Sequence, residues 1–411
     1  MVYSYIGGYM KIKNENDVQK SFSTSETILL VIMASIVSYF IGHTLVFNKT
    51  EVKVVRYDPY VQEFADNYDY IVDNYYEKVD RQELINKAIS GMLESLDDPY
   101  SVYIDESESD NFNITLTGSY QGIGVQIVKD EVSKYIYISS VFNNSPASDA
   151  GLLAGDYIIS VNGISTIDLE AEEFSKRVRN SNEKVFNMRI LRNNQEIDVQ
   201  VTRREVVLDS VVSEIYEKNN KKVGYIYIGI FATNTYEQFK SQLDNMKSQG
   251  IDSIIIDVRD NTGGHLSSVD NILDLFIDSN HTKYKFYQNG ITTNFKGKNK
   301  TVDKYNIVLL GNENSASASE VLIAGLKENL DVKLIGKKTY GKGTVQELVN
   351  LSDGNQYKIT IKKWLTPLGN WVNDTNGILP DIEVELDSKY YETRDDLDDT
   401  QLQAAIDYLT K

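Results

Sequence analysis

The spacing of apolar and polar residues changes several times along this chain, and each change marks a different kind of segment. Near the start, an apolar run covers residues 27–47, contains no Asp, Glu, Lys or Arg, and has the length of a helix that crosses a bilayer. Lysines at positions 11, 13 and 20 precede the run, and this bias favours a cytoplasmic N-terminus. No small-residue cleavage site follows the run, so an uncleaved anchor is expected rather than a signal peptide.

These features predict a cytoplasmic tail over residues 1–24 and a single transmembrane helix over residues 25–47. Everything from about Asn48 onward is then expected outside the cytoplasm. A buried core helix is the alternative interpretation of the apolar run.

Helical spacing follows, with apolar residues three and four apart between Tyr57 and Leu96. Asp98-Pro99 ends this pattern, because the residue before a proline is disfavoured in helical geometry. We therefore expect an N-terminal helical region over residues 51–112. Its aromatic side chains are candidates for pairing with another copy of the chain, which would give a homodimer.

Short alternating runs of apolar and polar residues fill positions 113–204 and predict a small β-rich domain. The expected strands cover residues 124–128, 135–139, 157–161, 185–191 and 196–202. Helical segments are expected at residues 145–150 and 172–178.

Strands and helices alternate over residues 205–386, as in an α/β domain. Strands are expected at 223–228, 253–258 and 306–310, and helices at 235–249, 267–277 and 316–328. The strand at 253–258 is almost continuously apolar, so both of its faces are expected to be covered. Runs at 332–335, 345–349 and 358–363 are expected to complete the same sheet. Residues 387–411 are expected to form an acidic tail, solvated as far as Asp399, with a short helix near its end.

Composition removes several classes of function. The 411 residues carry a net charge of −18, which argues against a nucleic-acid-binding protein, because such proteins present a basic face. With no cysteine in the chain, disulfides, thiolate zinc sites and cysteine nucleophiles are excluded. The sequence also lacks HExxH, a Walker loop and a Rossmann fingerprint. We expect neither a metal nor a cofactor.

A serine in the position of a nucleophile lies within Ser315-Ala-Ser-Ala-Ser-Glu320. Ser317 follows an expected strand and opens the next helix, where unpaired amides and the helix dipole favour a developing negative charge. The same residues match the S-x-x-E capping box. On this motif alone, capping is the favoured interpretation.

A lysine that could act as a base lies within Tyr340-Gly-Lys-Gly-Thr-Val-Gln346. Lysine accepts a proton only when it is neutral, so burial must lower the pKa of Lys342 well below its ordinary value. Gln346 lies an even number of residues further along an expected strand, hence on the same face, where it could orient the amine. The alternative for Lys342 is a solvated surface charge.

Gly263-Gly264 ends the expected buried strand, at the edge of an α/β sheet where ligands bind. An N–H of Gly263 or Gly264, with that of Ala316 or Ala318, could form an oxyanion hole. A plain strand-to-helix turn is the alternative. His265 follows directly and is a competing candidate for the base.

The β-rich domain has a glycine loop of its own, formed by Gly122, Ile123, Gly124 and Val125. Its amides could bind the carboxylate of a peptide while the adjoining strand edge accepts the peptide by β-augmentation. The alternative is a small barrel whose glycines only turn corners.

Taken together, these motifs resemble those of the carboxyl-terminal processing peptidases, the tail-specific proteases of family S41. Leu96-Asp-Asp-Pro-Tyr-Ser101 is similar to that family's helical-region signature, and Gly377-Ile-Leu-Pro-Asp-Ile382 to the strand motif closing its core. The motifs around Gly264, Ser317 and Lys342 resemble its three active-site blocks. The resemblance implies an α/β (α+β) protease core of the ClpP/crotonase-like S41 type over residues 205–386, and a β-barrel-like PDZ domain over residues 113–204.

Residue by residue, the resemblance implies that Ser317 is the nucleophile, Lys342 the general base and Gln346 its orienting partner. It also implies that Arg179 couples the PDZ domain to the active site. The chain departs from the family after Arg179, where residues 180–183 replace the glycine and proline preferred there. It departs again at Trp371, an unusual second tryptophan, which is expected to alter substrate preference without touching the dyad.

The sequence therefore predicts a membrane-anchored serine endopeptidase that cleaves extracytoplasmic proteins or peptides and recognises their C-termini through its PDZ domain. A catalytically silent PDZ scaffold at the membrane is the alternative from another class. The intact set of Ser317, Lys342 and Gln346 argues against the scaffold, because a binding module needs none of them.

Overall fold

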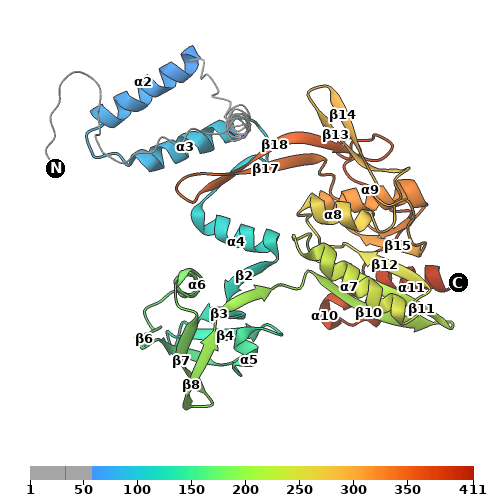
Figure 1. Cartoon of the computed structure of the whole chain (residues 1–411), viewed down its shortest axis with the longest axis horizontal. Coiled ribbons are helices and arrows are strands. Elements are labelled where there is room, and N and C mark those ends of the chain that lie inside the picture. The colour runs from blue at the N-terminus through green and yellow to red at the C-terminus, as the bar shows by residue number, and fades with distance from the viewer. Residues whose placement is uncertain (1–32, 34–57) are drawn as a thin grey trace, which may run out of the picture. The chain divides into compact units, whose positions relative to one another are not determined.

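The computed structural model describes Met33 and residues 58–411, and it divides the chain into two compact units, Met1–Leu84 and Ile85–Lys411 (Figure 1). The predicted tail at 1–24 and anchor at 25–47 lie outside the described residues, apart from Met33. Within the described part, no helix is long and apolar enough to cross a membrane.

The N-terminal helical region consists of two helices, α2 (Pro59–Asn74) and α3 (Arg81–Glu94), rather than one continuous helix. The side chain of Asp58 caps α2 by accepting a hydrogen bond from the N–H of Tyr60. The boundary between the two units falls inside α3, so the expected region 51–112 is not one compact body.

The β-rich domain has the predicted strands and both predicted helical segments. Its antiparallel sheet has the strand order β3-β4-β5-β7-β8. Apolar side chains such as Ile136, Ile158 and Met188 fill its core. The elements are β3 (Val125–Lys129), β4 (Ile136–Val141), α5 (Pro146–Asp149), β5 (Tyr157–Val161), β6 (Ile164–Ser165), α6 (Ala171–Asn180), β7 (Val185–Arg192) and β8 (Gln195–Thr202).

A two-stranded connector joins this domain to the rest of the second unit. Helix α4 (Glu106–Thr117) runs into β2 (Ser119–Gly122), which pairs with β9 (Arg204–Val207) on the chain's way out of the domain. The carbonyl of Leu116, at the end of α4, accepts a hydrogen bond from the N–H of Thr233 in the core. Helix α4 begins inside the helical region expected over residues 51–112 and extends past it, and the pairing of β2 with β9 was not expected from the sequence.

The core of the second unit is a six-stranded sheet with the order β10-β11-β12-β15-β16-β19. All pairs are parallel except β10 with β11. All five residues of β12 are buried, as its apolar run predicted. The strands are β10 (Val211–Lys218), β11 (Lys221–Ile228), β12 (Ser253–Asp257), β15 (Asn306–Gly311), β16 (Lys333–Gly336) and β19 (Ile382–Glu383).

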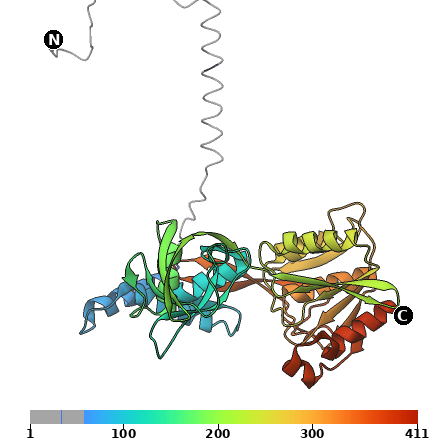
Figure 2. The ribbon, with the colours of Figure 1, turned by 90° about the horizontal axis from the view of Figure 1, so that it is seen from below.

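Helices cover both faces of this sheet (Figure 2). On one face lie α7 (Thr235–Ser248), α8 (Leu266–Leu273) and α9 (Ala318–Leu330), which share a large apolar core with the sheet. The opposite face packs against α11 (Thr400–Thr410) through a second apolar cluster. This three-layer arrangement explains why β12 is apolar on both sides.

Two strands that we expected in this sheet belong to another one. Strands β17 (Thr344–Asn350) and β18 (Gln356–Leu365) form a hairpin in a separate antiparallel sheet. The expectation that residues 345–349 and 358–363 complete the parallel sheet is therefore wrong. These strands keep polar residues between their apolar ones, which suits a sheet with one open face. The remaining members are β1 (Val102–Ile104), β13 (Thr282–Gln288) and β14 (Ile291–Lys296).

The acidic C-terminal segment is also different from expectation. After α10 (Ser388–Thr393) and a 3₁₀ turn at Asp396–Asp398, Asp399 is only 1% exposed and α11 is part of the core. The Asp399 carboxylate accepts hydrogen bonds from Arg259 at 3.0 and 2.8 Å. Arg259 also pairs with Asp257 at the end of β12. The prediction of a solvated tail is wrong for Asp399, because its charge neutralises a buried arginine.

We expect Asp399→Ala to lower the free energy of unfolding by about 3 kcal/mol, because it leaves the buried Arg259 with half of its partners. Asp407→Ala, which removes an exposed ion pair with Lys218 from the same helix, should cost less than about 1 kcal/mol. Urea unfolding of the two variants measures the difference. Equal losses would show that the buried network does not stabilise the core.

Candidate active site

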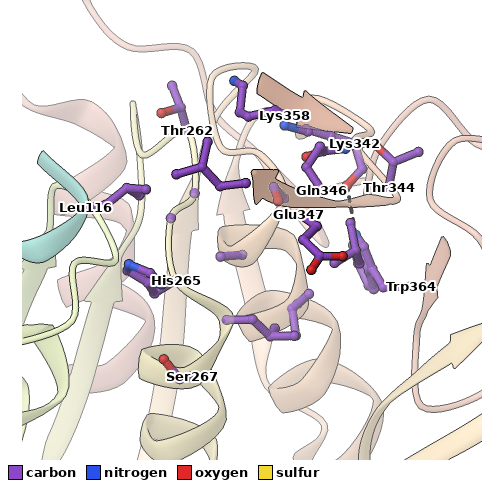
Figure 3. Close-up of a pocket in the computed structure, with 18 of the residues that line it drawn as sticks. Leu116, Thr262, His265, Ser267, Lys342, Thr344, Gln346, Glu347, Lys358 and Trp364 are labelled. Atoms are coloured by element: carbon purple, nitrogen blue, oxygen red, sulfur yellow. Dashed lines mark hydrogen bonds between the residues drawn. The ribbon is translucent and has the colours of Figure 1, made fainter. Parts of the chain in front are cut away.

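One cavity of about 730 Å³ brings the predicted catalytic residues together (Figure 3). Its lining includes Ser317, Ala318, Lys342, Gln346, His265 and both glycines of the Gly263-Gly264 turn. Loops at the carboxyl ends of the parallel strands form one wall, and the β17–β18 hairpin contributes the other. Residues from four separate parts of the sequence therefore meet at one site.

Ser317 is the serine of its motif that lines this cavity. Its neighbours Ser315 and Ser319 are fully buried and donate their hydroxyl hydrogens to the carbonyls of Val258 and Asn261. Ser317 itself has φ 55° and ψ −111°. A positive φ is costly for a residue with a side chain and is often found at functional sites.

Glu320 connects the serine turn to the lysine loop. This fully buried carboxylate accepts hydrogen bonds from the N–H of Ser317 at 2.9 Å, Gly341 at 2.7 Å and Lys342 at 2.8 Å. The Thr339 hydroxyl donates a fourth at 2.6 Å. Burial raises the pKa of Glu320, while these donors act against that rise. The capping motif pointed to the bond with Ser317, but nothing local in the sequence pointed to the distant partners.

Lys342 is partly buried, and its burial lowers the pKa of its amine below the ordinary value. The positive charge of Lys358 lowers the same pKa further, and Asp98 and Glu320 act in the opposite direction. The amine lies 4.4 Å from the centre of the Tyr100 ring. Among the described residues, no hydrogen bond joins it to Ser317 or Gln346. The proposed dyad thus shares a cavity without being in direct contact.

Gln346 does not contact Lys342 as we expected. Its side-chain amide donates to the hydroxyls of Thr344 at 2.9 Å and Thr360 at 3.1 Å. Lys342 lies before β17 begins, and a bulge follows Val345, so the two-residue alternation does not extend from position 342 to 346. Figure 3 nevertheless places Gln346 and Lys342 on the same side of the cavity.

Both tryptophans of the chain hold the lysine loop. The indole N–H of Trp364 donates to the carbonyl of Lys342 at 2.8 Å (Figure 3), and that of Trp371 donates to the carbonyl of Gly343 at 2.9 Å. A Cβ atom on Gly343 would lie 2.3 Å from the Trp371 nitrogen, so this position requires glycine. Trp371 thus fixes the backbone next to the lysine, although among the described residues no hydrogen bond joins it to Ser317 or Lys342.

The glycine turn narrows the choice of oxyanion donors. The N–H of Gly263 donates to Asn261 at 2.9 Å, and that of Ala316 donates to the Asn261 carbonyl at 3.0 Å. The N–H groups of Gly264 and Ala318 donate to no group among the described residues. In this arrangement the Gly263 N–H is already bonded to Asn261, so Gly264 and Ala318 are the available pair of candidate donors. Gly264 also has φ 132° and its missing Cβ would collide with the Phe231 carbonyl, so the turn has a structural reason as well.

His265 lies on the other side of the cavity from Lys342 (Figure 3). Burial lowers the pKa of its imidazole. Its backbone N–H donates to the Phe231 carbonyl at 2.6 Å, and its side chain has no hydrogen bond to Ser317 among the described residues. It remains a competing candidate for the base, which a substitution can test.

A second cavity, of about 240 Å³, lies in the β-rich domain between β3 and α6. The predicted peptide-binding residues Gly122, Ile123 and Val125 line it, and so does Arg179. Val125 and Ile127 supply the strand side, and Phe174 and Val178 supply the helix side. A groove between a strand edge and a helix is the arrangement that β-augmentation requires.

A sheet flanked by helices, a serine at a strained turn and an accessory peptide groove define a serine protease with a PDZ domain. Sequence comparison gives the same result: residues 222–384 match the peptidase family S41, and residues 113–190 match the PDZ domain. Residues 44–108 match the activating protease CtpB N-terminal domain. The chain belongs to the carboxyl-terminal processing proteases of family S41, which confirms the resemblance found in its motifs.

Two Bacillus relatives are identical to this chain at about a third of the aligned positions. The carboxy-terminal processing protease CtpB of Bacillus subtilis is 36% identical over 321 residues, which cover 77% of this chain and 66% of that protein. CtpA of the same organism is 35% identical, with 78% and 68% covered. A photosystem II D1 C-terminal processing protease superposes with a TM-score of 0.43 at 24% identity, covering 77% of this chain and 86% of that one. The chain thus spans about two thirds of the length of these Bacillus relatives.

Proposed function

We propose that this S41 protease is a membrane-anchored endopeptidase of the Ser–Lys type that acts on extracytoplasmic proteins near their exposed C-termini. The Ser–Lys assignment rests on the position of Ser317 in a strained turn. Ser317 shares one cavity with Lys342, whose amine has a pKa that is lowered by burial. No metal or cofactor is needed for this chemistry.

In the proposed mechanism the neutral amine of Lys342 takes the proton of the Ser317 hydroxyl as its oxygen attacks the scissile carbonyl. The N–H groups of Gly264 and Ala318 donate to the oxyanion that forms. The lysine then passes the proton to the departing amine, and water hydrolyses the acyl-enzyme by the same route. Because the amine lies over Tyr100 in the structure, it must first turn toward Ser317, so we assign this arrangement to a resting state.

Membrane attachment and dimerisation are further parts of the proposal. The uncharged run at residues 27–47 supports an anchor with the protease outside the cytoplasm. Helix α2 has no buried residue and carries several large apolar side chains that are exposed, which supports pairing with a second copy. These side chains are Tyr60, Val61, Phe64, Tyr70 and Ile71.

The proposed function is tested by incubating the full chain, held in detergent, with a loosely folded protein and identifying fragments by mass spectrometry. Fragments should form, and they should disappear when Ser317 and Lys342 are both replaced by alanine. A silent PDZ scaffold would yield no fragments, whether the parent chain or the double alanine variant is used. If His265→Ala alone abolished cleavage while Lys342→Ala did not, histidine would be the base.

The pH dependence of cleavage should depend on Lys358. Activity requires the neutral form of Lys342, so kcat/KM should rise as the pH rises through the lowered pKa of that amine. Lys358→Met removes one cause of the lowering, so the rise should move to higher pH. Lys358→Arg retains the charge and should leave the profile in place. A profile that Lys358→Met leaves unchanged would contradict the assignment of Lys342 as the base.

A further inference from the structure

A tyrosine side chain of the same molecule lies against the glycine loop of the PDZ groove. Tyr120 of β2 lines the groove together with Gly122 and Ile123. Its ring covers the first glycine of the loop so closely that a Cβ atom on Gly122 would lie 2.2 Å from the ring. Its phenol lies near the N–H of Gly124, in the middle of the loop, and this N–H acts to lower the pKa of the phenol.

The conformation of the loop is fixed at Gly124 by hydrogen bonds to its carbonyl and by close packing. The carbonyl of Gly124 accepts hydrogen bonds from the N–H of Phe142 at 3.0 Å and from the Ser145 hydroxyl at 3.3 Å. Gly124 has φ 81°, and a Cβ atom there would lie 2.2 Å from Ser145, so no other residue fits. The N–H that meets the phenol is thus one that a peptide carboxylate would otherwise take.

We infer that Tyr120 is an intramolecular plug: its phenol holds the carboxylate subsite of the PDZ groove, and the C-terminal carboxylate of a substrate must displace it to bind. This inference rests on the proposed recognition of C-termini and adds the residue that competes with them. Burial raises the pKa of Tyr120, so the phenol is neutral at physiological pH.

Arg179 gives the incoming carboxylate its advantage over the phenol. It lies on α6, lines the same groove, and is close enough to Tyr120 to act to lower the pKa of its phenol. Among the described residues, no acidic side chain forms an ion pair with Arg179. A bound carboxylate would gain this attraction and a charge-assisted bond from Gly124, neither of which the neutral phenol provides. The plug therefore yields to a free C-terminus and resists an uncharged peptide end.

The segment that carries Tyr120 also reaches the active site. Helix α4 directly precedes β2, and its residues Asn111 and Ile114 line the PDZ groove. Phe112 and Leu116 of the same helix line the catalytic cavity. Displacement of the Tyr120 plug thus acts on α4, the helix whose residues line both cavities.

The test measures peptide binding separately from cleavage, in the full chain with Ser317→Ala. A fluorescent peptide ending in Val-Ala-Ala is titrated with its carboxylate free and with its C-terminus amidated. Tyr120→Phe keeps the ring but lacks the hydroxyl, and it should bind the free-carboxylate peptide about five-fold more tightly, the effect of one hydrogen bond. The amidated peptide should bind weakly and equally to both proteins. Arg179→Gln should weaken only the free-carboxylate peptide.

Tyr137→Phe, on β4 and outside the lining of the groove, serves as the control and should leave both affinities unchanged. Tyr120→Leu, which removes the ring as well, should also bind more tightly than the parent. Equal or weaker binding by Tyr120→Phe would overturn the plug and make the phenol a donor to the ligand instead. Absence of peptide binding by every variant would also overturn the plug. The Ser–Lys mechanism would be unaffected by that result, because cleavage is measured separately.

Discussion

Replacement of Ser317 by alanine is expected to lower kcat/KM by about 10³-fold or more, because the hydroxyl that forms the acyl-enzyme is lost. Ser317→Gly should be equally inactive. It should also unfold with a free energy about 1 kcal/mol higher, since glycine adopts the positive φ of this position without strain. Cleavage of a quenched fluorescent peptide measures the first effect, and urea unfolding measures the second.

Ser267→Ala is the matched control, because this exposed serine lines the same cavity and has no part in the proposed chemistry. It should keep activity within about two-fold of the parent chain. A Ser317→Ala protein that stays folded and retains a tenth of the parent's activity would remove Ser317 from the mechanism.

Lys342→Met should cause a loss of similar size, about 10³-fold, because the proposed base that takes the serine proton is lost. Lys342→Arg is the more discriminating change. It retains the positive charge and the long side chain, but a guanidinium does not lose its proton in proteins, so activity should be lost as completely. Lys300→Met, at an exposed lysine outside the cavity, should have no effect. High activity in the arginine variant would mean that position 342 supplies charge rather than a base.

Patterns in the sequence correctly predicted those helices and strands that depend on residues close together in the sequence. Strand β12 is almost continuously apolar because helices cover both faces of its sheet. Strands β17 and β18 were found as strands but assigned to the wrong sheet, because alternation reports which faces are covered and not which strand lies beside which. Asp399 looked solvated for a related reason, since its partner Arg259 is 140 residues away in sequence.

Contacts between residues that are distant in sequence were likewise not predicted at the candidate active site. The motifs identified Ser317 and Lys342 because a helix start and a pair of glycines are local features. The buried link through Glu320 joins residues that only the fold brings together. Gln346 was assigned to the face of Lys342 by counting residues, and the bulge in β17 made that count invalid. The hydrogen bond from the Gly263 N–H to Asn261, which no sequence pattern reveals, favours Gly264 over Gly263 as the candidate oxyanion donor.

The proposed mechanism requires the Lys342 amine to leave Tyr100 and meet the Ser317 hydroxyl when substrate is bound. A crystal structure of the chain with a peptide boronate attached to the Ser317 oxygen would measure this distance. We expect the Lys342 nitrogen within about 3 Å of that oxygen, and the Gly264 and Ala318 N–H groups directed at the boronate. An amine that still lies over Tyr100, with His265 or water beside the serine instead, would contradict the Ser–Lys mechanism.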